Sequence, residues 1–241
     1  MVLRTRRKQT KKYYFSVEGE TEKWYLEWLQ KQINDSANLC FNVCFDIKVQ
    51  KDPVAMVKSS VIFGGEDIFH FFDFESSAPC HLKSRNDTFR RLKEANTIKG
   101  VNYHPAYSNF CFELWLLLYK KCLRSSFTDR KQYLKEINRV FNKNFENLHQ
   151  FKHRDNFISV LNTLTFEDFL QAIKNSESIA RDCEDHGRRN QIYGFYFYEN
   201  NPATSVGAVF KLILKGCGFL FSSKNKYGLK IIIKSVIEGG A

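Results

Sequence analysis

The chain has 241 residues and a mass of 28.4 kDa, and its apolar content of 43% is enough to fill the core of one large domain or two small ones. The formal net charge of +11 favours an anionic partner, either nucleic acid or an anionic membrane surface. A zinc domain and a membrane-spanning protein are disfavoured, because the seven cysteines contain no Cys-x-x-Cys pair and the longest apolar stretch, residues 110–119, is too short for a spanning helix.

Residues 1–12, MVLRTRRKQTKK, are predicted to be a basic arm. Such an arm is either a solvated tail or a segment that contacts phosphate, and the sequence favours neither. It lacks the longer apolar region and the small-residue cleavage site of a signal peptide, so we expect a cytoplasmic protein.

Patterns typical of strands and helices alternate over residues 13–121. The predicted elements are a strand at 13–17, a helix whose apolar positions run from Trp24 to Ile33, a strand at 41–49, a helix at 54–62, a strand at 68–74, an exposed helix at 81–99, a strand at 101–107 and an apolar helix at 110–121. Parallel strands need crossover connections, which are usually helices. The alternation therefore predicts an α/β core in which helices flank a mostly parallel sheet.

Residues 122–195 are richer in Lys, Arg, Asn and Phe, and helical periodicity in QYLKEINRVF and FEDFLQAIKN predicts a helical insertion or subdomain. Residues 196–241 are expected to pack back on the core as a C-terminal segment. Within them, Asn201-Pro202 is typical of a helix start and Gly216 of a helix end. The stretch 227–237 is compatible with a strand or with a closing helix.

The stretch VEGETEKWY, residues 17–25, crowds three acids between the first strand and the first helix of a basic chain. Glu20 and Glu22 suit the positive N-terminal end of that helix, which is the simpler explanation for both. Glu18 instead follows the strand directly. In an open α/β sheet, ligands bind in the crevice beyond the carboxyl ends of the strands, so Glu18 is a candidate site residue.

A second group of acids, Asp73 and Glu75, closes a strand-like segment at 69–75. Residues two apart on a strand share a face, so the two carboxylates should emerge together and meet Glu18 at the same sheet edge. Converged carboxylates repel one another, and their pKa values rise unless a cation neutralises them. The sequence therefore predicts a site for a hard, oxygen-preferring cation, Mg²⁺ or Mn²⁺.

Glu113 is an ionisable group inside the apolar segment FCFELWLLLY. If it is buried, its carboxylate needs a cation or a hydrogen-bonding partner. Its position near the start of the helix that follows the 101–107 strand places it near the same sheet edge, which favours a role in the metal site over a structural ion pair. Ser108 and Asn109 are its expected polar neighbours.

Three separated motifs carry a resemblance to a known family. They are EGETEKWY at 18–25, SNFCFELWL at 108–116 and NPAT at 201–204. The first motif and the later Asp-Phe-Glu at 73–75 resemble the Toprim pattern of one Glu and a downstream Asp-x-Asp, and the three motifs together resemble the RloB-like branch of Toprim-type proteins. Glu75 departs from the pattern where Asp is usual, and Phe110 departs from it where Pro is usual.

The resemblance implies a Toprim-like α/β core and a metal-dependent endonuclease that acts on DNA or on RNA such as tRNA. It also implies a role in anti-phage defence, by abortive infection, beside a large ATPase partner. On this hypothesis Asp73 and Glu75 hold Mg²⁺, and Glu18 holds a second metal or acts as general acid or base. Glu113 completes the catalytic set, and water is the attacking group.

Basic residues near the acids are candidates to bind the polyanion. They are Arg85, Arg90, Arg91 and Lys93 after the acidic pair, and Arg188 and Arg189 beside the aromatic run from Tyr193 to Tyr198. A solvated helix face is the competing explanation for the first group, and core packing explains such aromatic runs more often than base stacking does. The alternative function is a non-catalytic module that binds nucleic acid or the ATPase. Topoisomerase or primase chemistry is disfavoured, because no zinc-binding domain is recognisable.

Overall fold

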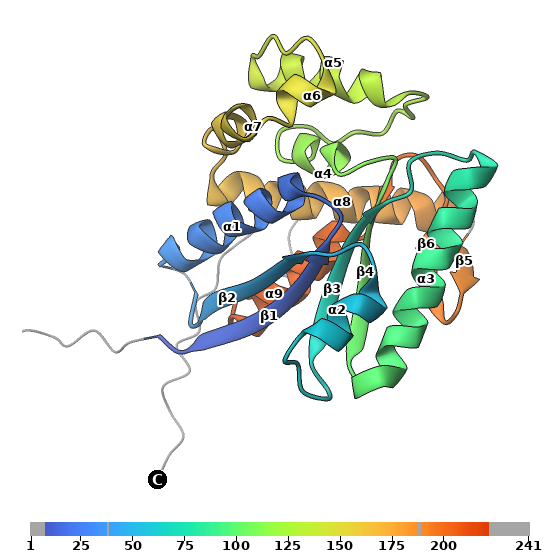
Figure 1. Ribbon diagram of the computed structural model, residues 1–241. Coiled ribbons are helices and arrows are strands. Elements are labelled where there is room, and N and C mark those ends of the chain that lie inside the picture. The colour runs from blue at the N-terminus through green and yellow to red at the C-terminus, as the bar shows by residue number, and fades with distance from the viewer. Residues whose placement is uncertain (1–7, 38, 188, 222–241) are drawn as a thin grey trace, which may run out of the picture.

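The computed structural model describes residues 8–37, 39–187 and 189–221. Among them a five-stranded sheet has the strand order β2-β1-β3-β4-β7 (Figure 1). Its strands are β1 (Thr10–Val17), β2 (Asn42–Val49), β3 (Asp67–Asp73), β4 (Asn102–Asn109) and β7 (Ala203–Thr204). β1 pairs in parallel with β2 and β3, β3 pairs in parallel with β4, and the short β7 runs antiparallel to β4. The predicted α/β fold with a mostly parallel sheet is confirmed.

Helices cover both faces of the sheet. One layer contains α1 (Glu20–Asp35), α4 (Glu113–Leu117), α8 (Phe166–His186) and α9 (Val206–Gly216), and the other contains α2 (Pro53–Ser59) and α3 (Pro79–Lys99) (Figure 1). In β3, the ring of Phe71 lies 5.9 Å from Phe210 of α9, whereas the ring of Phe72 lies 5.5 Å from Phe89 of α3. Strands buried on both faces are apolar almost throughout, which explains the run IFHFF.

The predicted helical insertion lies over the carboxyl edge of the sheet. It contains α5 (Arg130–Phe141), α6 (Leu148–Phe151) and α7 (Arg154–Leu161), and it leads into α8 (Figure 1). A capping side chain starts α5, where the carboxylate of Asp129 accepts a 2.7 Å bond from the backbone N–H of Lys131. Thr165 caps α8 in the same way.

The helical run ends at His186, so the last residues of the stretch predicted as helical are not helical. They belong to an antiparallel hairpin of β5 (Arg189–Ile192) and β6 (Phe195–Tyr198). The helix predicted to start at Asn201-Pro202 is also wrong at its start, because α9 begins at Val206. Residues 203–204 pair with the end of β4 instead, and a capping signal in the local sequence cannot anticipate that contact. The helix ends at Gly216 as predicted.

Several further boundaries also differ from the prediction. The strand predicted to reach residue 74 ends at Asp73, and the apolar helix shortens to α4. The predicted basic arm overlaps the start of β1, where Lys12 forms a 2.8 Å ion pair with Asp46. Residues 1–7 and the stretch 227–237 lie outside the described residues. None of the helices in the described ranges is both long and apolar enough to cross a membrane.

Candidate functional site

Acidic side chains line a cleft at the ends of β1 and β3. Glu18 follows β1 directly, Asp73 is the last residue of β3, and Glu75 lies two residues further on. Two adjoining cavities of about 360 and 350 Å³ are both lined by these three acids and by Lys51. We refer to the two cavities together as the acidic cleft. The structure thus brings the three predicted acids to one edge of the sheet.

The carboxylate of Asp73 is crowded by other acids and contacted by one arginine. Burial raises the pKa of Asp73 well above its ordinary value, and three neighbouring glutamates, Glu113 first, add to the shift. Arg130 at the start of α5 opposes it. One terminal nitrogen of its guanidinium lies 3.0 Å from Oδ2 of Asp73, and the other lies 3.4 Å from Oε1 of Glu75.

Glu18 lies beside Asp73 and is itself perturbed. Its Oε2 accepts a 3.5 Å hydrogen bond from the backbone N–H of Asp73. Burial, followed by the charge of Glu22, raises the pKa of Glu18 to about 7, although the charge of Lys51 acts in the opposite direction. A carboxyl group with this pKa exchanges protons near neutral pH, as a general acid or base must.

Glu75 reaches the cleft through a backbone turn. Its φ of 60° lies in the left-handed region, and a 2.9 Å bond from its N–H to the carbonyl of Phe110 holds the turn. Its carboxylate contacts Arg130 and, through Oε2, Nε2 of His81 at 2.8 Å. The prediction of a shared strand face for the acidic pair is therefore wrong, because β3 has ended. Their common contact with Arg130 brings the two carboxylates together instead.

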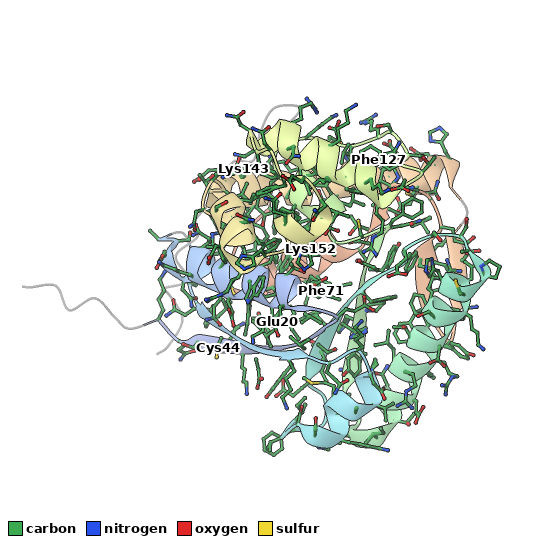
Figure 2. The ribbon with its side chains drawn as sticks, turned by 45° about the horizontal axis from the view of Figure 1, so that its top comes forward. Glu20, Cys44, Phe71, Phe127, Lys143 and Lys152 are labelled. Atoms are coloured by element: carbon green, nitrogen blue, oxygen red, sulfur yellow. The ribbon has the colours of Figure 1, made fainter. Side chains whose placement is uncertain are left out.

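Glu113 is buried, with 2% of its surface exposed, at the first position of α4. Its Oε1 lies 2.8 Å from Nζ of Lys152, whereas its Oε2 has no hydrogen-bond partner among the described residues. Burial acts to raise the pKa of Glu113, but the charge of Lys152 and several hydrogen bonds lower it overall. An ion pair, the explanation that the sequence favoured less, is thus present. Lys152 also lines the acidic cleft, together with Glu20 at the start of α1. Figure 2 labels both side chains.

Ser108 and Asn109 end β4 and contact the C-terminal segment. Oγ of Ser108 lies 3.3 Å from Oγ1 of Thr204, and Nδ2 of Asn109 donates to the carbonyls of Glu199 and Asn200 at 3.0 and 2.8 Å. In the described part of the chain, neither side chain forms a hydrogen bond with an acid of the cleft. Through these hydrogen bonds the two residues hold the C-terminal segment next to the acidic cleft.

Sequence reasoning missed the cations of the cleft and the burial of one acid. Arg130 and Lys152 lie in the helical insertion, far along the chain from Asp73, in segments that carry no motif. Glu22 was visible in the EGETE motif, but its side chain is buried and accepts a 3.0 Å bond from Thr21, and burial raises its pKa. The favourable position of Glu22 in the first turn of α1 therefore does not describe its surroundings fully.

The donor chemistry of the acidic cleft fits a hard divalent cation. Carboxylate oxygens are the ligands that Mg²⁺ and Mn²⁺ prefer. Burial first, and then neighbouring glutamates, raise the pKa values of Glu18 and Asp73, and a bound cation would oppose that shift. Oε2 of Glu113 is a buried acceptor without a partner in the described structure. Among the described residues, however, no group of three or more His, Cys, Asp or Glu side chains is arranged as a metal site. Arg130 contacts the carboxylates of Asp73 and Glu75 in this arrangement.

Most of the arginines predicted to bind nucleic acid form ion pairs. The pairs are Arg85 with Glu199, Arg90 with Asp87 and Arg91 with Asp52. Lys93 is exposed and forms no ion pair within the described ranges. Arg188 lies outside the described residues. The guanidinium of Arg189 lies 3.9 Å from the ring centre of Tyr196.

Comparison with known proteins gives one family. The family model of the RloB-like proteins matches residues 13–213, which include most of β1, the helical insertion and most of α9. The chain belongs to the RloB-like family. No curated protein and no solved structure matches it significantly. The predicted membership of the RloB-like family is thus confirmed.

Proposed function

We propose that this RloB-like protein is a metal-dependent nuclease of Toprim type that hydrolyses phosphodiester bonds in DNA or RNA. The observation that carries the proposal is the meeting of Glu18, Asp73 and Glu75 in one cleft at the carboxyl edge of a parallel sheet. Acids with perturbed pKa values in such a cleft are candidates for catalysis. The net charge of +11 suits a polyanionic substrate. The family resemblance supports a role as effector of anti-phage defence, controlled by a partner ATPase.

Each acid has a role in this proposal. Asp73 and Glu75 would hold Mg²⁺ or Mn²⁺, which supplies positive charge to a non-bridging phosphate oxygen when bound. Glu18 in its ionised form would take a proton from the attacking water, and a pKa of about 7 makes both of its protonation states available at neutral pH. Glu113 would stay ionised beside Lys152 and support the site.

The cations of the cleft have a matching role. Arg130, Lys152 and Lys51 line the acidic cleft together with the acids. Basic side chains that contact a phosphate stabilise the charge that develops during phosphoryl transfer. A guanidinium can bind a carboxylate or a phosphate with two parallel hydrogen bonds. We therefore propose that substrate phosphate draws Arg130 away from Asp73 and leaves the carboxylate free for the metal.

A cleavage assay tests the proposal. Single-stranded DNA, duplex DNA and tRNA are incubated with the full chain and Mg²⁺ or Mn²⁺, with and without the partner ATPase. Asp73→Asn and Glu18→Gln are expected to lower the cleavage rate by about a hundredfold or more. Asp67→Asn is the matched control, because Asp67 is the exposed acid at the opposite end of the same strand. Equal cleavage by the wild type and Asp73→Asn would contradict the proposal.

The alternative is a non-catalytic module that binds nucleic acid or the ATPase. The observation that favours it is the engagement of Asp73 and Glu75 by Arg130, together with the lack of an assembled metal site in the part of the chain that the structure describes. This alternative predicts binding without metal-dependent cleavage, and binding that Asp73→Asn leaves unchanged.

A further inference from the structure

The β5–β6 hairpin exposes two aromatic rings beside α3. Phe197 and Phe195 pack inward, with ring centres 5.1 and 5.9 Å from that of Phe89 on α3. Tyr196 and Tyr193 lie outside this packing and are 52% and 48% exposed. Core packing therefore explains only part of the aromatic run, and the two exposed tyrosines need another explanation.

Tyr193 occupies a backbone position that suits another residue better. The turn between β5 and β6 has two central residues, Tyr193 with φ of 49° and Gly194 with φ of 91°. A hairpin turn with positive φ at both positions prefers Asn or Asp before Gly. A bulky residue in the left-handed region is an uncommon and strained choice. Because the tyrosine ring is also exposed, the strain is not offset by burial of the ring in the core.

Tyr193 and residues of α3 line one slot. This slot has a volume of about 480 Å³, and its lining residues on α3 include Lys83, Ser84, Asp87 and Arg90. Lys83 is exposed and forms no ion pair among the described residues, whereas Arg90 is paired with Asp87 at 2.6 Å. An aromatic face next to a free ammonium group offers stacking to a base and a charge to its phosphate.

The slot adjoins the acidic cleft. Ser84 and Asp87 of α3 line both, so the slot borders the cleft that holds Asp73 and Glu75. The guanidinium of Arg189 stacks on Tyr196 at 3.9 Å. Because Tyr196 alternates with Phe195 and Phe197, this pair lies on the hairpin face that points away from α3 and takes no part in the slot.

We infer that the slot between Tyr193 and α3 is a subsite for an unpaired nucleobase, which guides a single strand of nucleic acid into the acidic cleft. The inference rests on the proposed nuclease function and names its substrate as unpaired DNA or RNA. A stacked base must present a free face, and the bases of a duplex are already stacked on one another. The affinity for duplex nucleic acid should therefore not depend on the ring of Tyr193.

Binding in EDTA tests the subsite separately from cleavage. The anisotropy of a short fluorescein-labelled single strand is measured with the full chain, and a duplex of the same sequence is compared. Tyr193→Ala is expected to weaken single-strand binding about fivefold or more and to leave duplex binding unchanged, whereas Tyr193→Phe keeps the ring and the affinity. Phe63→Ala is the control, because Phe63 is 73% exposed in the loop between α2 and β3.

Tyr193→Asn separates binding from folding. Asparagine suits the turn, so this variant should be at least as stable as the wild type while it loses single-strand affinity as Tyr193→Ala does. Wild-type affinity in Tyr193→Asn overturns the subsite, and the nuclease proposal still stands if Asp73→Asn abolishes cleavage. Ring-dependent binding of the single strand without any metal-dependent cleavage supports the subsite and rejects the nuclease.

Discussion

At the scale of single residues, the surroundings separate the acids of the cleft into two kinds. Glu18 and Asp73 have raised pKa values because burial and neighbouring acids disfavour their charge. The pKa of Glu113 is lowered because its contacts, with Lys152 foremost, outweigh burial. Carboxyl groups whose pKa values are pushed apart suit different roles in one reaction. Glu18 is the better candidate for proton transfer, and Glu113 for a permanently charged support.

His70 gives the fold a pH dependence of its own. The ring is fully buried, lies 2.7 Å from Oγ of Ser16, and burial lowers its pKa from 6.5 to about 4. Between these values the unfolded chain binds more protons than the folded one. The contribution of His70 to the free energy of unfolding is therefore present above a pH of about 6.5 and is lost as the pH falls toward about 4.

Urea unfolding of the wild type and His70→Asn tests this contribution. Between about pH 6.5 and about pH 5, the wild type should lose about 2 kcal/mol more stability than the variant, because only the wild type must keep an imidazole unprotonated. The other titrating groups cancel in the comparison. An equal loss in both proteins over this range would show that His70 does not titrate as proposed.

At the scale of elements, the sequence predicted those features of the fold that depend on residues close together in the chain. The sequence showed the alternation of strands and helices up to α4. It also showed the acids of the first motif and of residues 73–75. Each of these patterns lies within a few consecutive residues. The start of α9 and the turn at Glu75 were not visible in the sequence, because pairing of β7 with β4 and the bond to Phe110 set them from a distance. Arg130 was missed for the same reason, since its contact with Asp73 depends on how the insertion packs.

Close packing of α9 against α8 depends on Gly207. A Cβ atom at this position would lie 1.8 Å from Oγ of Ser176 and 3.3 Å from the ring of Trp115. Gly207→Ala is expected to destabilise the protein by about 1–3 kcal/mol in urea unfolding, since overpacking forces neighbours to shift. Ser176→Gly in the same chain should recover part of the loss, which a double-mutant cycle measures. Unchanged stability in Gly207→Ala would mean that α9 can move freely against α8.

At the scale of the whole molecule, the helical insertion meets the sheet edge through two cations. Arg130 of α5 contacts Asp73 and Glu75, and Lys152, just after α6, contacts Glu113. The insertion thereby supplies positive charge to a cleft whose acids come from the core. This arrangement keeps the acids together when no other cation neutralises them, and it links the position of the insertion to the state of the site.

Removing the charge of Arg130 should separate metal binding from cleavage. Arg130→Gln is expected to raise Mn²⁺ affinity about fivefold, because the metal no longer competes with the guanidinium, and to lower cleavage, because the phosphate loses a partner. Arg130→Lys keeps the charge, so its Mn²⁺ affinity and its cleavage rate should lie between those of the wild type and Arg130→Gln. Calorimetry and the cleavage assay on the same preparations measure both effects. Weaker metal binding in Arg130→Gln would mean that the arginine organises the carboxylates instead of competing for them.

The most direct test of the acidic cleft is Mn²⁺ and Mg²⁺ binding by calorimetry, with the full chain alone and with a short oligonucleotide present. We expect the wild type and Asp67→Asn to bind the metal, and Asp73→Asn to lose binding while it remains folded by circular dichroism. A folded wild type that binds no metal at millimolar concentration under either condition would contradict a metal-dependent site. That result would instead favour a protein that binds nucleic acid or its partner without cutting.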